Sequence, residues 1–272
     1  MARRIQAGER AKGNDDFWGF VWQGAPSEAL TCNALEWQVS EGGGTILDEQ
    51  GRVTVTNPHT IRAWDRAARW VGSISPPGVI GYKEWDAFNM WQAWKAAFMR
   101  NWASADTAAR TPNSPTKDRF DIAPLPRGEA GIAATIGGNG YGVSRHSLHP
   151  EQAAMLVRFL CSRDEQLRRS RSVALPSAQV YNDAEVMAIN PYYSRVLEVF
   201  STGKASRPST AARKMYPDVS RAYFETVNEV LSRRKNASQA AADLQKELTR
   251  ILKTDATGAD AALERKPAAA SP

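Results

Sequence analysis

The stretch RFDIAPLPRGEAGIAATIGGNGYGVS, residues 119 to 144, is the one on which the predicted fold depends. It holds two short apolar runs separated by prolines and glycines, and helical patterns lie on both sides of it. Pro124 and Pro126 restrict the residues before them to extended backbone, and the glycines between 137 and 140 allow conformations that other residues avoid. A strand pair with a glycine corner suits a crossing between two lobes, although such corners also occur in ordinary turns.

Composition favours a globular protein and argues against a nucleic-acid partner. The 272 residues are 42% hydrophobic, which is enough for one large domain or two smaller ones. The net charge of +6 is mild, and Lys and Arg are scattered among acids, whereas a nucleic-acid footprint would be clustered. The nine Trp either fill the core or stack on flat apolar ligand faces.

The N-terminus carries no export signal that the sequence reveals. Residues 1–10 have no apolar core and no cleavage site, and no later segment is apolar for long enough to span a membrane. They resemble the end of an amphipathic helix, so we expect a truncated form that lacks an upstream segment. Cys32 and Cys161 are far apart and have no metal-type neighbours; free buried thiols and a disulfide both stay open.

Helical and strand patterns alternate along the chain, which predicts an α/β fold. Asn57 and Pro58 form a strong helix start, and Ser27 and Ser238 are candidate N-caps. Residues 107–117 are predicted to be a surface loop. The strands are expected at 17–23, 46–48 and 53–55, and the helices at 28–39, 58–71, 84–99, 150–161, from 164 onward, 183–189, 191–200, 216–231 and 238–252.

No catalytic constellation stands out, so we expect no enzyme, no cofactor and no metal. The three His show no metal-ligand spacing, and His146 and His149 lie beside a helix start that begins with proline. Residues 114–117 match S-x-x-K, but in a proline loop. The glycines at 137–142 do not match the dinucleotide-binding pattern. A glycosidase carboxylate pair stays open, because Asp and Glu are plentiful.

Several ordered motifs resemble the extracellular solute-binding proteins of carbohydrate ABC transporters, and most closely the trehalose, maltose and sucrose type. The similarity covers nearly all of residues 1–253. Its motifs are GFVWQG (19–24), EALTCNALEW (28–37), AAFMRNW (96–102), APLPRGEAGIAATIGG (123–138), ALPSAQVYNDAEVMAINPYY (174–193), SRPST (206–210) and NASQAAADLQKELTRIL (236–252).

The resemblance implies a periplasmic-binding-protein-like type II fold, with two lobes that close on a sugar. Residues 1–135 and 178–253 would form the C-terminal lobe, and most of the N-terminal lobe would be absent. Residues 139–177 would be a returning segment of the N-terminal lobe. From their composition, residues 254–272 are predicted to be a disordered tail.

The resemblance also implies the ligand-binding residues. Trp102 would stack on a sugar ring, while Gln23, Glu28 and Arg207 would bind hydroxyl groups, and Asn139 would face the cleft. The alternative for Trp102 is a position in the core. For Gln23, Glu28 and Arg207, the alternative is a helix cap or a surface pair. Two positions depart from the family pattern, since Asn139 replaces a Trp and Ser27 replaces a Tyr.

The expected function is therefore the substrate-binding subunit of an ABC sugar importer. Its partners would be a di- or oligosaccharide such as trehalose, maltose or sucrose, and the permease subunits. By resemblance it would act in the periplasm or at the cell surface, and the missing signal peptide leaves export open. The alternatives are a non-exported remnant without ligand binding and a carbohydrate-active hydrolase.

Overall fold

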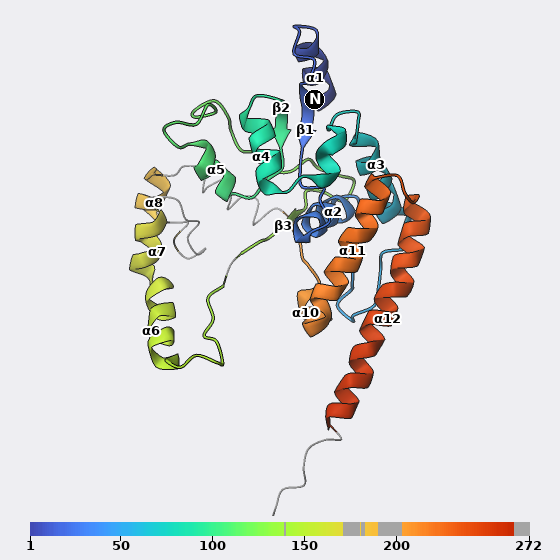
Figure 1. Cartoon of the computed structure of the whole chain (residues 1–272), viewed down its shortest axis with the longest axis vertical. Helices are drawn as coiled ribbons and strands as arrows, with labels where there is room; N and C mark the ends of the chain where they lie inside the picture. Colours follow the sequence, from blue (N-terminus) through green and yellow to red (C-terminus); the bar gives the residue numbers. More distant parts are fainter. Residues whose placement is uncertain (139, 171–179, 181–182, 190–202, 264–272) are drawn as a thin grey trace, which may run out of the picture.

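The computed structural model describes residues 1–138, 140–170, 180, 183–189 and 203–263 (Figure 1). The strands are β1 (Trp18–Val21), β2 (Ala96–Met99), β3 (Ala134–Thr135) and β4 (Lys204–Ala205). The helices are α1 (Ala2–Arg10), α2 (Glu28–Ser40), α3 (Pro58–Trp70), α4 (Glu84–Gln92), α5 (Ser104–Ala109), α6 (Pro150–Leu160), α7 (Arg163–Ser170), α8 (Ala184–Ile189), α10 (Ser209–Ala212), α11 (Tyr216–Leu231) and α12 (Ala237–Leu263), with short 3-10 turns at Pro77–Gly81 and Arg213–Met215.

Helix α2 lies in the middle of the fold. It packs against α3 and α11, and β3 and β4 run beside it (Figure 1). Nearly all of its residues after Glu28 are buried, including the polar Asn33, Glu36 and Gln38. A helix that is buried all round must be enclosed by other elements, and its polar side chains must find partners inside the protein.

Two parallel strand pairs hold the segments that are distant in sequence. β1 pairs with β2, with Phe20 opposite Phe98, and β3 pairs with β4, with Thr135 opposite Ala205. Each pair brings together segments about 70 to 80 residues apart, as parallel pairing requires a long crossover. These two pairs fix the edges of the site described below.

Aromatic side chains dominate the core around α2. Trp22 meets Trp37 edge-on at 4.9 Å between ring centroids, and Trp37 meets Trp70 at 5.6 Å. Trp64 lies edge-on to Tyr223 at 5.7 Å, which joins α3 to α11. Edge-to-face contacts add stability beyond the area they bury. Several of the nine Trp are therefore core residues.

The helix starts are partly as predicted. Asn57 caps α3, because its Oδ1 accepts a hydrogen bond from the Thr60 N–H at 2.9 Å. Ser27 occupies the N-cap position of α2 but makes no capping bond; its hydroxyl donates to the Ala25 carbonyl instead. At α12 the predicted cap was two residues late, because Asn236 accepts from the Gln239 N–H.

The prediction of one helix over residues 84–99 was wrong. Helix α4 ends at Gln92, and Ala96–Met99 form β2. Trp94 has a φ of 60°, a left-handed conformation that no helix can continue through. The apolar residues beyond it gain more from pairing with β1 than from another helical turn. The loop predicted over 107–117 was also partly wrong, since α5 occupies its first residues.

The central stretch does not fold as the expected pair of strands. Within its described residues, the Gly128–Gly131 bridge and the two-residue β3 are the strand-type contacts, and β3 pairs with β4 rather than within the stretch. Figure 1 shows the chain running from β3 to α6, which stands with α7 and α8 beside the main body. The two-lobe boundaries stay a prediction. The tail predicted from 254 is helical as far as Leu263.

In the described part of the chain, no helix combines the length and the apolar character needed to cross a membrane.

The two candidate caps of α2 and α3 give a matched stability test. Replacing Asn57 by Ala is expected to lower the free energy of unfolding by about 1–2 kcal/mol, because it removes a capping bond and leaves backbone groups unpaired. Replacing Ser27 by Ala should change it by less than about 0.5 kcal/mol, since no capping bond is lost. Urea unfolding of both variants measures this; equal losses would contradict the capping assignment.

Candidate functional site

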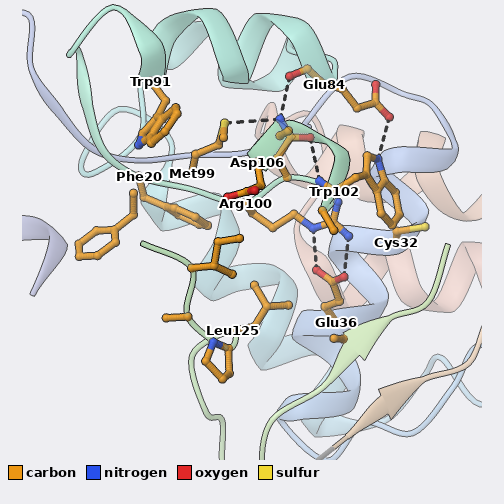
Figure 2. Close-up of a pocket in the computed structure, with 18 of the residues that line it drawn as sticks. Phe20, Cys32, Glu36, Glu84, Trp91, Met99, Arg100, Trp102, Asp106 and Leu125 are labelled. Atoms are coloured by element: carbon orange, nitrogen blue, oxygen red, sulfur yellow. Dashed lines mark hydrogen bonds and ion pairs between the residues drawn. The ribbon is translucent and has the colours of Figure 1, made fainter. Parts of the chain in front are cut away.

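A broad open cavity of about 2650 Å³ runs along one side of the fold. Its wall includes parts of β1, α2, β2, the segment from Arg100 to Asp106 and the stretch 119–138 (Figure 2). Arg207 also lines it. Enclosed ligand pockets usually measure about 300–1,000 Å³. The cavity is therefore a groove in which a ligand site occupies only a part.

A buried ion pair forms the floor of this groove. Arg100 Nε donates to Glu36 Oε2 at 3.0 Å, and Arg100 Nη2 donates to Glu36 Oε1 at 2.6 Å (Figure 2). Both side chains are only 4% exposed. Burial alone would lower the pKa of Arg100, but the Glu36 carboxylate beside it raises the pKa overall, so the guanidinium stays charged. Such a two-bond pair has a fixed geometry.

The same carboxylate anchors β3. The backbone N–H of Thr135 donates to Glu36 Oε1 at 3.0 Å, and the Thr135 hydroxyl donates to the Cys32 carbonyl at 3.1 Å. Glu36 thereby ties α2 to both β2 and β3. The pair accounts for the position of the two strands relative to the helix.

Gln23 lies directly behind Arg100. Its Nε2 donates to the Arg100 carbonyl at 2.8 Å, and its Oε1 accepts from Arg100 Nη1 and from Asn33 Nδ2, each at 3.1 Å. Gln23 is fully buried, and it is not among the described residues that line the cavity. The structure gives this predicted ligand-binding residue a supporting position, from which it holds Arg100.

Trp102 lines the cavity, and neighbouring residues contact both the edge and the face of its indole ring. Its Nε1 donates to Glu84 at 3.2 Å, and the Arg100 guanidinium carbon lies 4.3 Å from the ring centroid (Figure 2). Gly137 packs so closely that a Cβ there would lie 2.9 Å from Cζ3 of the ring. A side chain at 137 would push the ring aside. The Trp102 ring is therefore fixed in place at the cavity surface.

Glu28 and Arg207 form a second ion pair at the cavity wall, 179 residues apart in sequence. Arg207 Nη1 donates to Glu28 Oε1 at 2.8 Å, and Arg207 Nη2 donates to the Ile136 carbonyl at 3.2 Å. The hydroxyls of Tyr216 and Ser220 also donate to Glu28. Burial, and then the neighbouring Glu28, raise the pKa of Tyr216, so its hydroxyl keeps its proton.

The structure thus brings Trp102, Glu28 and Arg207 to one cavity, whereas Asn139 lies outside the described residues. Sequence reasoning missed the Arg100–Glu36 pair and the two hydroxyls on Glu28. Arg100 offered one usable signal, since it is a charged residue at the end of a run of apolar residues.

Neither a metal centre nor a disulfide occurs in the described part of the chain. No group of three or more His, Cys, Asp and Glu side chains lies close enough to hold a metal ion there. Both cysteines are free, with Cys32 buried and Cys161 exposed. Burial raises the pKa of the Cys32 thiol to about 12, so it remains protonated and unreactive at neutral pH.

The chain belongs to the bacterial extracellular solute-binding proteins, whose family model matches residues 4–167. A probable ABC transporter-binding protein of Deinococcus radiodurans is 40% identical to it over 254 residues, which are 92% of this chain and 60% of that relative. A probable amino-acid ABC transporter periplasmic-binding protein of Sinorhizobium fredii is 24% identical over 75% of this chain and 46% of its own length.

A solved structure agrees with this assignment. Maltose-bound MalE3 of T. maritima superposes with a TM-score of 0.79 and 33% identity, over 92% of this chain and 63% of that one. The predicted type II binding-protein fold is confirmed. The family and relatives are solute-binding proteins and not enzymes, so the hydrolase alternative falls. The chain spans about 60% of the length of the first of these relatives.

The buried ion pair should be far more costly to break than a surface pair. Replacing Arg100 by Met leaves Glu36 charged and buried, which should lower the free energy of unfolding by about 3–5 kcal/mol. Replacing Arg52 by Met removes an exposed pair with Asp48 and should cost about 1 kcal/mol or less. Denaturant unfolding compares the two variants, and similar losses would contradict the role given to the pair.

Proposed function

We propose that this chain binds a di- or oligosaccharide, such as maltose, trehalose or sucrose, as the substrate-binding component of an ABC sugar importer. The observation that carries the proposal is the Trp102 ring, fixed at the cavity surface beside two paired sets of charges. In the whole protein it would act with permease subunits, in the periplasm or at the cell surface. This chain, which covers about 60% of the length of its relative, would supply mainly one of two lobes.

The site suits the two kinds of surface that a sugar presents. Sugar rings have apolar C–H faces, and an aromatic ring such as Trp102 can stack on them. Hydroxyl edges need donors and acceptors, which Arg207 and the carboxylate of Glu28 supply at the cavity wall. Gln23 contributes by holding Arg100, and we keep Asn139 as a predicted contact on family resemblance alone.

Charge pairing favours a neutral sugar over an amino acid. Arg100 is matched by Glu36, and Arg207 is matched by Glu28. An amino acid brings a carboxylate and an ammonium group, and each needs an opposite charge that is not already paired. The pairs described here leave hydrogen-bonding capacity without net charge. This supports a sugar ligand, as in the maltose-bound relative, rather than the amino acid named for the Sinorhizobium fredii relative.

Titration calorimetry of the purified chain with maltose, trehalose and sucrose tests the proposal. Micromolar binding to at least one sugar is expected, with no heat from glutamate at the same concentration. A folded monomer that gives no heat with all three sugars would contradict sugar binding by this chain. That result would leave the alternative of a remnant without ligand binding.

Stacking on Trp102 makes a separate prediction. Replacing Trp102 by Ala should weaken sugar binding about five- to thirtyfold, since an aromatic platform of this kind contributes on the order of 1–2 kcal/mol. Replacing Trp85 by Ala is the matched control, because Trp85 is 64% exposed and is not among the described residues lining the cavity. Calorimetry on both variants decides it, and unchanged affinity in the Trp102 variant would remove stacking from the proposal.

A further inference from the structure

Asp106 is a further carboxylate of the cavity wall, on α5, four residues after Trp102. Its side chain is only 2% exposed. Oδ1 accepts a hydrogen bond from Arg110 Nε at 2.8 Å, whereas Oδ2 has no hydrogen-bond partner among the described residues. A buried oxygen without a partner is costly, and in a native protein it calls for an explanation.

The surroundings of Asp106 hold the carboxylate in one position. The Arg110 guanidinium that binds Oδ1 lies over the Phe120 ring, 4.5 Å from its centroid. Phe120 in turn meets Trp91 edge-on at 5.1 Å between ring centroids. Figure 2 shows Asp106 among the side chains that line the cavity. Oδ1 is thus engaged by a side chain that is itself packed, and Oδ2 is the oxygen left for another donor.

The charge of the pair indicates what kind of donor fits. Burial raises the pKa of Asp106, Arg110 lowers it and the nearby Asp121 raises it further. Because Arg110 already supplies the matching positive charge, a second cation would leave an excess charge in a buried place. A neutral hydroxyl donates a hydrogen bond without that excess. Because Asp106 lies in the cavity wall, a donor in the cavity can approach Oδ2 while Oδ1 keeps its bond from Arg110.

We propose that Oδ2 of Asp106 accepts a hydrogen bond from one hydroxyl group of the bound sugar, and that Asp106 thereby helps to determine which sugar the site accepts. The inference rests on the proposed function. It adds an anchor next to the Trp102 platform and separate from the Glu28–Arg207 pair. The hydroxyl that Asp106 binds would be one that a competing sugar lacks or orients differently.

The experiment combines a change in the protein with a change in the ligand, as in a double-mutant cycle. Binding is measured by titration calorimetry with maltose and a set of monodeoxy maltoses. Asp106→Ala should bind maltose about tenfold or more weakly than the unchanged chain. One monodeoxy maltose should bind the unchanged chain weakly by a similar factor, and Asp106→Ala should no longer distinguish it from maltose. Asp106→Asn, which keeps the shape, should lie between the two.

Asp118→Asn is the matched control, because Asp118 is exposed and loses the same charge outside the cavity wall. It should bind maltose as the unchanged chain does. If the unchanged chain binds maltose and Asp106→Ala binds it equally well, the inference is wrong while the proposed function stands. A uniform loss against every deoxy sugar would also overturn it, since it would mean that Asp106 acts only by holding Arg110. An unchanged chain that binds none of these sugars would overturn both.

Discussion

The Arg100–Glu36 ion pair is the interaction on which the rest of the structure depends. It joins Glu36 of α2 to Arg100, the residue directly after β2, and Thr135 of β3 donates a further hydrogen bond to Glu36. Two opposite charges out of water are stable only when their remaining donors and acceptors are satisfied. Gln23 and Thr135 provide that satisfaction, so the floor of the cavity is a connected polar network inside an aromatic core.

This network explains why the cavity wall is well defined although it is open. Trp102 follows Arg100 by two residues, and its ring packs against the Arg100 guanidinium. The ion pair that holds Arg100 therefore also helps to hold the ring. Glu28 is held independently, by Arg207 from a segment near the C-terminal helices and by two hydroxyls of α11. The candidate binding surface therefore rests on two separately held groups of side chains rather than on loops alone.

Local signals in the sequence predicted much of the secondary structure. Helix α11 has the predicted bounds, and the Asn57–Pro58 start of α3 was correct because capping acts within a few residues. The helix over 84–99 failed because the left-handed turn at Trp94 has no signature in the sequence, and because the pairing of β2 with β1 is a contact made almost 80 residues away.

The candidate site shows the same difference between features that depend on nearby residues and features that depend on contacts distant in sequence. Trp102, Glu28 and Arg207 were found through family resemblance, and the cavity brings them together. Composition and spacing could not have joined Glu28 to Arg207 across 179 residues, nor Arg100 to Glu36 across 64. Gln23 follows the end of β1, and its side chain could point either into the cavity or into the core. Only the packing of the folded protein decides between these two directions.

The two cysteines differ in a way that is useful at the bench. Cys32 is enclosed and stays protonated, whereas Cys161 is exposed at the end of α6. With only two Cys in the chain, a thiol-directed dye has one reactive target. This chain therefore carries a single labelling site, next to helix α6, which Figure 1 shows with α7 and α8 beside the main body. A dye at this position would report on the surroundings of α6 without any change to the sequence.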